Sequence, residues 1–435
     1  MRLTLKEIAN VCGGTLKGDD ADVFGLSIDS RTIKAGELYV AIRGKALDGH
    51  DFCRSAMDRG ASGCLVSRPV EAPHILCADT VEAFQAAAKS YRMNFDIPVV
   101  GITGSSGKTT TKDMTAAVLQ KKYRTLKTEG NLNNQTGVPQ VLCKLDTCHE
   151  AAVIEMGSNH FGEIAPLAAM VQPTVCLFTN IGDAHIEFFK DRRGTLAEKT
   201  EMIRFMKKGG AVIVNGDDPL LREIDHDISY GFGENCTVRG EQIDADGIFG
   251  TSFTAVFSGQ KLRIKLPLAG RHMVQNALAA IATGARLGVD APLMAEALEA
   301  FEPSGARAQL IKTPELTLIN DCYNANPASM LAALETLTKA GGRRVAILGD
   351  MGELGREAPR FHRETALAAL SLGVDVLILI GETFFACSIF GANSFKTVEE
   401  ARDGLRELIQ PGDTVLLKAS RSMGLESLLP DLKQF

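Results

Sequence analysis

A glycine-rich loop carries the clearest chemical signal in this sequence. The apolar run VVGIT leads into Gly104-Ser-Ser-Gly107-Lys108-Thr109-Thr110, and a helical stretch follows. Backbone N–H groups of such a loop surround phosphate oxygens, and the positive end of the helix dipole adds to the attraction. In this pattern Lys108 reaches the outer phosphates and the Thr109 hydroxyl group ligates Mg²⁺. The loop therefore predicts a nucleoside triphosphate site, with an ordinary glycine-rich turn as the alternative.

The loop departs from the form found in GTPases and motor ATPases. That form, G-x-x-x-x-G-K-[ST], needs glycine at the position of Ile102. The guanine-reading pattern N-K-x-D is absent, and a D-x-x-G match at Asp191–Gly194 is short enough to arise by chance. A G-protein switch is therefore disfavoured.

Three further residues occupy positions where metal or catalytic chemistry is possible. Glu155 follows the apolar run AAVI, so it ends a strand, beside the phosphate loop in any parallel sheet. Taken alone, a glutamate there is more often a loop-capping carboxylate. His185 follows a strand, where an isolated histidine is ordinarily just a satisfied polar residue. Lys199 lies in the amphipathic stretch TLAEKTEMIRFM, where a lysine is ordinarily a solvated charge.

In combination, these residues and four longer segments resemble the Mur ligase family of cell-wall synthesis. The segments are GITGSSGKTTTKDM (101–114), EGNLNNQTGVP (129–139), NDCYNANPASM (320–330) and ILGDMGELG (347–355). The resemblance covers the chain nearly end to end. It is strongest to the members that join D-alanyl-D-alanine to UDP-N-acetylmuramoyl-tripeptide. The D-N-P-R motif of the diaminopimelate-adding members is not found.

The resemblance implies an ATP-dependent, ADP-forming amide ligase of peptidoglycan synthesis that works through an acyl phosphate. It implies UDP-N-acetylmuramoyl-tripeptide and D-alanyl-D-alanine as small-molecule substrates, and ATP with two Mg²⁺ ions. It also implies that Lys199 is carbamylated by CO₂, which converts a cation into an anion that supports the metals. Another Mur-type or folylpolyglutamate-like ligase remains an alternative, as does a regulatory ATP-binding module.

The family's site residues can be placed on this chain position by position. Arg307 is the least regular placement, because SGARAQ lacks the commoner glycine directly before arginine. A turn with a surface ion pair is the alternative for the residues at the UDP end. The implied catalytic residues are Lys108, His185, Lys199 and Arg307, and the implied metal ligands are Thr109, Glu155, His185 and Lys199. The implied nucleotide contacts are Thr103, Gly104, Ser105, Ser106, Gly107, Lys108, Thr109, Thr110, Asn276, Arg307 and Asp321. The implied substrate contacts are Ser30, Arg31, Gly44, His50 and Asp51 at the UDP end, and Asn131, Asn133, Asn134, Thr136, Tyr323, Asn324, Asn326, Lys418, Ser420 and Arg421 for the sugar, peptide and dipeptide.

Apolar runs and glycine-rich loops predict the elements that position these residues. Residues 1–80 mix short apolar runs with turns, which indicates a small α/β domain. The resemblance implies that this domain binds the UDP-sugar. Residues 81–309 alternate helical stretches with apolar strands, as in parallel βαβ units covered on both faces, and contain a hairpin at 253–266. The pattern of residues 310–435 indicates a second, Rossmann-like doubly wound sheet. The resemblance implies that this domain binds the dipeptide. We expect the last domain to close about a hinge near 305–312.

Composition excludes several other classes of protein. At 435 residues, with 45% hydrophobic and 23% charged, the chain reads as a folded protein of about three domains. Its 47 Lys+Arg against 53 Asp+Glu argue against a nucleic-acid binder. The ten cysteines show no zinc-site spacing and are expected to be buried, reduced thiols. Neither a signal peptide nor an apolar run of about 18 residues is found, so we expect a cytoplasmic, monomeric enzyme with no membrane span.

Overall fold

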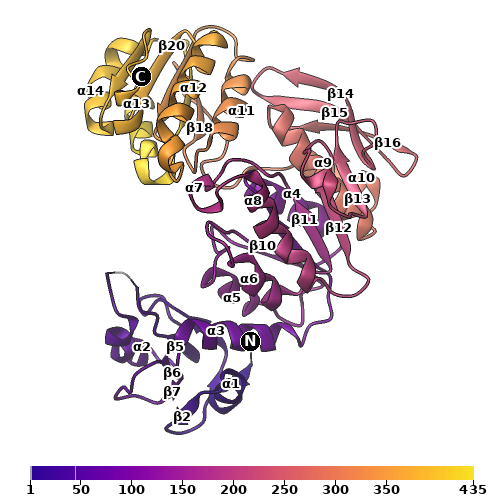
Figure 1. Cartoon of the computed structure of the whole chain (residues 1–435), viewed down its shortest axis with the longest axis vertical. Coiled ribbons are helices and arrows are strands. Elements are labelled where there is room, and N and C mark those ends of the chain that lie inside the picture. Colours follow the sequence, from indigo (N-terminus) through magenta and orange to yellow (C-terminus); the bar gives the residue numbers. More distant parts are fainter. Residues whose placement is uncertain (1, 45) are drawn as a thin grey trace.

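The computed structural model describes residues 2–44 and 46–435 and arranges them around three large sheets. Figure 1 shows the N-terminal part at the bottom, the central part at the right and the C-terminal part at the top. The α/β class predicted from the sequence is confirmed. Each predicted domain contains one large sheet. Gln309, the last residue assigned to the central domain, already belongs to the first strand of the C-terminal sheet. The boundaries themselves stay predictions.

The N-terminal part is built on a five-stranded mixed sheet. Its strands, in spatial order, are β2 (Thr15–Lys17), β7 (His74–Leu76), β6 (Gly63–Val66), β5 (Glu37–Val40) and β4 (Gly25–Ser27). A separate antiparallel pair joins β1 (Leu3–Thr4) to β3 (Asp22–Val23). The helices are α1 (Leu5–Cys12), α2 (Cys53–Asp58) and α3 (Thr80–Arg92). Helix α1 begins at a capping box formed by Thr4 and Glu7.

The central part is built on a nine-stranded sheet that is mostly parallel. Its strands, in spatial order, are β16 (Gln260–Leu266), β15 (Gly250–Phe257), β14 (Val238–Asp246), β13 (Ile228–Gly231), β12 (Ala211–Asn215), β11 (Val175–Phe178), β8 (Val99–Thr103), β10 (Ala151–Glu155) and β9 (Thr125–Lys127). Strands β14, β15 and β16 are antiparallel neighbours, and the last two form the predicted hairpin.

The strand order reverses direction at β8, which decides where a ligand can enter. Strands β9 and β10 follow β8 on one side, whereas β11, β12 and β13 continue on the other. In an open parallel sheet, the crevice outside the strand ends at such a reversal is where ligands bind. The phosphate loop follows β8 and therefore lies in this crevice.

Helices cover both faces of the central sheet. One face packs against α4 (Lys108–Gln120), α9 (Arg271–Arg286) and α10 (Ala291–Glu299). The other packs against α3, α5 (Gly137–Leu142) and α6 (Ile164–Val171), and α7 (Ile186–Phe189) and α8 (Arg192–Thr200) follow β11. The apolar core on the α3, α5 and α6 face continues through α3 to Leu5 and Ile8, so the N-terminal and central parts share one apolar interior.

The C-terminal part is a six-stranded, doubly wound sheet, as predicted. Its strands, in spatial order, are β17 (Gln309–Lys312), β18 (Thr317–Asp321), β22 (Thr414–Lys418), β19 (Arg344–Gly349), β20 (Val376–Ile380) and β21 (Ala392–Phe395). Only the edge strand β17 is antiparallel to its neighbour. The helices are α11 (Pro327–Leu337), α12 (Ala358–Ser371), α13 (Glu382–Ala386), α14 (Val398–Leu408) and α15 (Leu429–Leu432).

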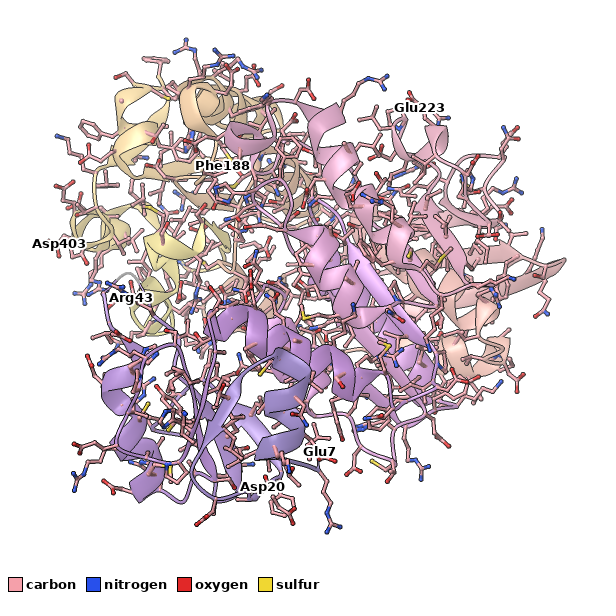
Figure 2. All side chains as sticks on the ribbon, turned by 60° about the horizontal axis from the view of Figure 1, so that its bottom comes forward. Glu7, Asp20, Arg43, Phe188, Glu223 and Asp403 are labelled. Carbon is pink, nitrogen blue, oxygen red and sulfur yellow. The ribbon has the colours of Figure 1, made fainter. Side chains whose placement is uncertain are left out.

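The surface and the cysteines complete the picture. Figure 2 shows Glu7, Glu223 and Asp403, from the three parts of the chain, at the outside of the molecule, where all are exposed. No helix within residues 2–44 and 46–435 is long and apolar enough to cross a membrane. The ten cysteines are free thiols, but only five are buried, and Cys148 is exposed. The expectation that all are buried was therefore wrong.

Candidate active site

The phosphate loop between β8 and α4 is built around two glycines. Gly104 and Gly107 have φ of 152° and 75°, values at which a side chain is strained, and a Cβ on Gly104 would overlap Thr179. Lys108 begins α4, and its Nζ donates to the Gly104 carbonyl at 2.7 Å. Burial lowers the pKa of Lys108, while nearby Glu155 acts in the opposite direction. The loop thus brings a lysine and a helix N-terminus to one point, as phosphate binding requires.

The residues after β11 brace this loop, and the sequence analysis missed them. Thr179 Oγ1 donates to the Ser106 carbonyl at 2.7 Å. Asn180 Oδ1 accepts from the Ser106 N–H, and its Nδ2 donates to Ser106 Oγ, each at 2.9 Å. In the sequence, Thr179 and Asn180 directly follow an apolar run, but the sequence does not show that this strand lies next to β8. Without the strand order, their position after a strand did not point to the phosphate loop.

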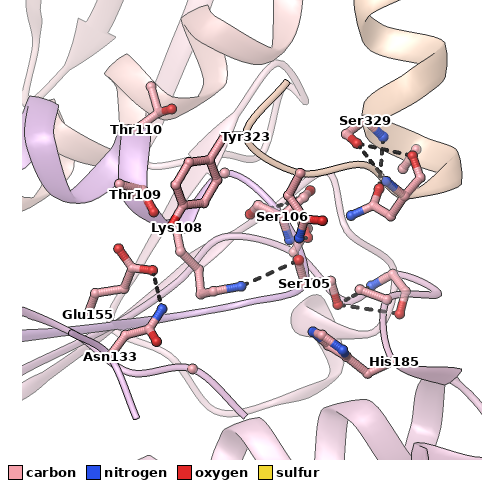
Figure 3. Close-up of a pocket in the computed structure, with 18 of the residues that line it drawn as sticks. Ser105, Ser106, Lys108, Thr109, Thr110, Asn133, Glu155, His185, Tyr323 and Ser329 are labelled. Carbon is pink, nitrogen blue, oxygen red and sulfur yellow. Dashed lines mark hydrogen bonds between the residues drawn. The ribbon is translucent and has the colours of Figure 1, made fainter. Parts of the chain in front are cut away.

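One cavity of about 960 Å³ brings together most of the site residues inferred from the sequence. The central part supplies one wall and the first turns after β18 and β22 supply the other. The predicted residues that line it are Ser105, Ser106, Gly107, Lys108, Thr109, Thr110, Asn131, Asn133, Asn134, Thr136, Glu155, His185, Asn276, Arg307, Asp321, Tyr323, Asn324, Asn326, Lys418 and Arg421. Figure 3 shows Lys108, Thr109 and Tyr323 together on one side of this cavity and His185 on another.

Thr103, Gly104, Lys199 and Ser420 do not line the cavity. Thr103 is the last residue of β8 and is fully buried. Gly104 lies at the base of the loop, packed on Thr179. Ser420 is buried, and its Oγ accepts from the Gly352 N–H at 2.7 Å. Their implied ligand contacts remain predictions.

Glu155 is the last residue of β10, and only one of its two carboxylate oxygens accepts a hydrogen bond. Asn133 Nδ2 donates to Glu155 Oε1 at 2.8 Å, and the backbone N–H of Glu155 donates to Thr128 at 3.0 Å. Oε2 is buried and has no hydrogen-bond partner in the part of the chain that the structure describes. A buried carboxylate oxygen without a partner is costly, so this atom fits a cation ligand.

His185 joins the central part to the C-terminal part. It has a left-handed φ of 58°, and its Nδ1 lies 2.5 Å from Oε2 of Glu353. The contact with His185 lowers the pKa of Glu353. Beyond this ion-pair contact, neither ring nitrogen of His185 makes a hydrogen bond to a described residue. Among the described residues, no group of three or more His, Cys, Asp or Glu side chains is arranged to hold a metal ion.

Lys199 is buried, and this overturns the ordinary expectation of a solvated lysine. The residue is 1% exposed, and Nζ lies 3.5 Å from Ser158 Oγ. Burial, followed by the nearby charge of Lys108, lowers the pKa of Lys199 to about 7. The neighbouring Glu198 is engaged elsewhere, since its carboxylate accepts three backbone N–H groups at the start of α6. Ser158, which lines the cavity, places Lys199 directly behind the wall.

Helix α9 contributes two residues on one face, four positions apart. Asn276 lines the cavity, and its Oδ1 accepts from Thr111 Oγ1 at 3.2 Å. His272, one turn earlier, also lines the cavity and was not predicted. Burial lowers the pKa of His272 to about 4, so the ring is neutral at pH 7. Because residues four apart lie on the same face of a helix, the position of Asn276 could have pointed to His272 as a cavity residue.

The C-terminal wall carries a buried ion pair. Lys418 Nζ donates to Asp321 Oδ2 at 2.6 Å and to the Asn324 carbonyl at 3.0 Å. Asn326 caps α11, accepting from the Ser329 N–H at 2.9 Å. Lys418 therefore holds the loop after β18 in place, and Asn326 fixes the start of α11, while both also line the cavity.

The Asn-rich loop is partly structural as well. Asn134 Oδ1 accepts from the N–H groups of Thr136 and Gly137 at 3.2 and 2.8 Å, which shapes the turn that begins α5. Asn133 holds Glu155, while Asn131 lines the cavity. Of the three asparagines, Asn131 is thus the one whose side-chain amide makes no hydrogen bond to another described residue.

The five residues inferred for the UDP end lie in the N-terminal part and do not line the cavity. Arg31 is exposed and pairs with Asp29 at 2.8 Å. Buried His50 has Nδ1 2.6 Å from Asp48 and accepts from the Ser67 N–H at 2.9 Å. The remaining three are Ser30, which is buried, Gly44, whose N–H donates to the Leu47 carbonyl, and Asp51, which pairs with Arg68. Arg31 and Asp51 form surface ion pairs, whereas Ser30 and His50 are buried, and a UDP site there stays a prediction.

The fold and the site define a class: three α/β parts, with a phosphate loop at the strand-order reversal of the middle one. The family models give that class a name. Residues 22–95 match the Mur ligase family catalytic domain, residues 102–284 the Mur ligase middle domain, and residues 306–421 the Mur ligase glutamate ligase domain. The chain belongs to the Mur ligase family.

Individual relatives are similar over almost the whole chain. The UDP-N-acetylmuramoyl-tripeptide–D-alanyl-D-alanine ligase of Bacillus subtilis is 35% identical over 453 residues, covering 99% of this chain and 98% of the relative. The crystal structure of MurF from Acinetobacter baumannii has a TM-score of 0.95 at 32% identity, covering 100% of this chain and 99% of the other. MurF from Thermotoga maritima, in complex with ADP, has a TM-score of 0.86 at 27% identity, covering 94% and 97%.

Proposed function

We propose that this chain is an ATP-dependent, ADP-forming ligase that joins D-alanyl-D-alanine to UDP-N-acetylmuramoyl-tripeptide in peptidoglycan precursor synthesis. The observation that carries the proposal is one cavity into which the phosphate loop, the Asn-rich loop and the C-terminal strand ends all open. The substrates follow from the relatives similar at full length. A folate-type or other Mur-type ligase is disfavoured by the same similarity. A purely regulatory ATP-binding module would not need the polar residues of the Asn-rich loop and of the C-terminal strand ends in the same cavity.

The chemistry requires activation, because a carboxylate oxygen is a poor leaving group. The γ-phosphate of ATP passes to the terminal carboxylate of the tripeptide, which forms an acyl phosphate and ADP. The dipeptide amine attacks the acyl carbon, the C–O bond breaks, and phosphate leaves as the amide forms. Lys108 and Arg307 neutralise charge on the phosphoryl group, and the loop N–H groups hold the phosphates in line. We assign Asn276 and Asp321, which line the cavity, to the adenine and ribose ends.

The residues near the phosphate loop fit Mg²⁺. Thr109 Oγ1 and Glu155 Oε2 are the oxygen donors, and His185 Nε2 is the candidate for a second ion. Mg²⁺ takes few protein ligands and relies on phosphates and water, which suits this sparse set. When bound, it supplies charge neutralisation to the phosphates. Asn133 orients the Glu155 carboxylate for this role.

Lys199 is proposed to carry the carbamate. A buried ammonium group is costly without a partner, and no carboxylate of the described residues lies within ion-pair distance of Nζ. With its pKa lowered to about 7, much of the amine is neutral near pH 7 and nucleophilic toward CO₂. The N–C bond forms as a proton leaves, and the resulting anion faces the charge of Lys108. Intact-mass measurement in bicarbonate buffer, compared with Lys199→Arg, tests the modification.

The N-terminal part is proposed to bind the UDP end and the C-terminal part the dipeptide, with closure bringing the two together. Because Gln309 begins β17, the hinge expected near 305–312 narrows to residues 305–308. No second copy is needed to complete the cavity, which supports a monomer. The free thiols support a cytoplasmic location.

A phosphate-release assay tests the proposal. The protein is supplied with ATP, Mg²⁺ and UDP-N-acetylmuramoyl-tripeptide, with and without D-alanyl-D-alanine, and the product is identified by mass spectrometry. We expect dipeptide-dependent phosphate release and a product heavier by the dipeptide less one water. Release that does not respond to the dipeptide, or that requires a folate, would overturn the proposal.

A further inference from the structure

The Arg307 guanidinium group lies between the phosphate loop and an aromatic ring. Its Nη2 donates to Thr109 Oγ1 at 3.1 Å, and its Cζ lies 3.5 Å from the centroid of the Tyr323 ring. Thr109 belongs to the first turn of α4 in the central part. Tyr323 follows β18 in the C-terminal part, and Figure 3 shows its ring beside Thr109 and Lys108. One side chain from the linker therefore contacts both parts.

Backbone contacts fix Arg307 to the C-terminal part rather than to the central part. The Tyr323 N–H donates to the Ala306 carbonyl at 3.1 Å, and the Ala308 N–H donates to Asp321 Oδ1 at 3.2 Å. These two hydrogen bonds hold the chain on either side of Arg307 against the residues after β18. The stacked ring and the guanidinium group are therefore both attached to the C-terminal part.

The linker is anchored to the central part only a few residues earlier. Ser304 Oγ donates to Asp113 Oδ2 at 2.6 Å, on α4. Between this anchor and Arg307 lies Gly305, with a φ of 67°, where glycine is permissive. A bend at Gly305 would carry Arg307 and Tyr323 together relative to the phosphate loop.

Stacking leaves the edge of the guanidinium group free to donate. The five N–H donors lie in the plane of the group, so an aromatic ring against its face holds its orientation without using them. We propose that Tyr323 is a positioning residue, whose ring holds Arg307 with its donors directed at the phosphate end of the nucleotide. This rests on the proposed function for the identity of the nucleotide. It differs from the expectation that Tyr323 contacts the amino substrate.

The test is a double-mutant cycle on nucleotide affinity. Tyr323→Leu removes the aromatic face, Tyr323→Phe keeps it, and each is made alone and with Arg307→Ala. Calorimetry measures the Kd of a non-hydrolysable ATP analogue with Mg²⁺, and thermal unfolding confirms that each variant is folded. We expect Tyr323→Leu to weaken binding by about 2- to 30-fold, the range of a cation–π contact, and Tyr323→Phe to restore affinity to within about 2-fold.

The Arg307→Ala background decides between positioning and an independent role. There, Tyr323→Leu should weaken binding by less than about 2-fold, because its partner is gone. A full loss in that background would overturn the proposal, as would equal losses for Phe and Leu, which would assign the role to the hydroxyl group. In kinetics, the KM for ATP should rise without a matching rise in the KM for dipeptide, and the reverse pattern would overturn it.

Failure of the proposed function is separable from failure of this inference. Nucleotide affinity is measured without either peptide substrate, so the cycle gives its answer whichever ligase reaction the chain performs. If wild-type protein shows no dipeptide-dependent phosphate release, the proposed function fails while the cycle still reports on Tyr323 and Arg307.

Discussion

Asn133 Nδ2 donates to Glu155 Oε1 at 2.8 Å, and this single hydrogen bond joins the Asn-rich loop to the end of β10. It turns the unpartnered oxygen of Glu155 to one fixed place beside the phosphate loop. A carboxylate held in this way needs no rearrangement to meet a cation, which is the physical meaning of a preorganised site.

Glu155→Gln should weaken the Mg²⁺ response of the protein. The amide keeps the shape of the side chain but removes its charge, so we expect at least about a tenfold fall in dipeptide-dependent phosphate release, about 1.4 kcal/mol. A titration of activity against Mg²⁺ should also shift to higher concentration. Glu335→Gln, an exposed carboxylate on α11, is the matched control. Equal Mg²⁺ curves for wild type and Glu155→Gln would remove Glu155 from the metal site.

Lys108→Ala should abolish most of the reaction while leaving the fold intact. Loss of the charge beside the transferring phosphoryl group should cost at least about 2.7 kcal/mol in the barrier, roughly a hundredfold in rate. Single-turnover phosphate release measures this directly. Lys122→Ala, an exposed lysine just beyond the same helix, should react at close to the wild-type rate. Near-normal turnover by Lys108→Ala would contradict the assignment.

Lys199 should make stability depend on pH in a defined direction. Its pKa in the folded protein, about 7, lies below the value of roughly 10.4 for a free lysine, so between these values the unfolded chain binds more protons. Stability contributed by this group therefore rises with pH across that window, by about 1.4 kcal/mol per pH unit at the steepest. Urea unfolding in CO₂-depleted buffer at pH 7 and pH 9 measures it.

The substitution Lys199→Met should remove that dependence. The free energy of unfolding of wild type relative to this variant should increase from pH 7 to pH 9. Lys208→Met, at an exposed position, should show no such difference from wild type. A parallel pair of pH profiles for wild type and Lys199→Met would mean that Lys199 is charged in the folded protein.

Closure about residues 305–308 should be visible in solution scattering. We expect the radius of gyration to decrease when a non-hydrolysable ATP analogue and UDP-N-acetylmuramoyl-tripeptide are added together, because the C-terminal wall of the cavity must approach the phosphate loop. Each ligand alone should give a smaller change. Superimposable profiles with and without both ligands would count against a hinge.

Features that depend on neighbouring residues along the chain could be read without coordinates. The order of glycines, Lys108 and Thr109 predicts a phosphate loop because a turn followed by a helix is a local structure. The alternation of apolar runs and helical stretches likewise predicted a parallel sheet, its hairpin at 253–266 and the doubly wound C-terminal sheet. Long-range contacts are not needed for these, since hydrophobic periodicity fixes which face of each element is buried.

Features that depend on which strands become neighbours were decided only in three dimensions. Asn180 braces Ser106 because β11 lies next to β8, and no local pattern reveals that order. The amphipathic pattern around Lys199 indicated solvent, yet packing of α8 behind the cavity wall buries it. Arg307 meets Tyr323 because the linker folds back on the end of β18. Strand order and helix packing are set by the whole core, so the environment of these side chains follows from the assembled fold rather than from their own segments.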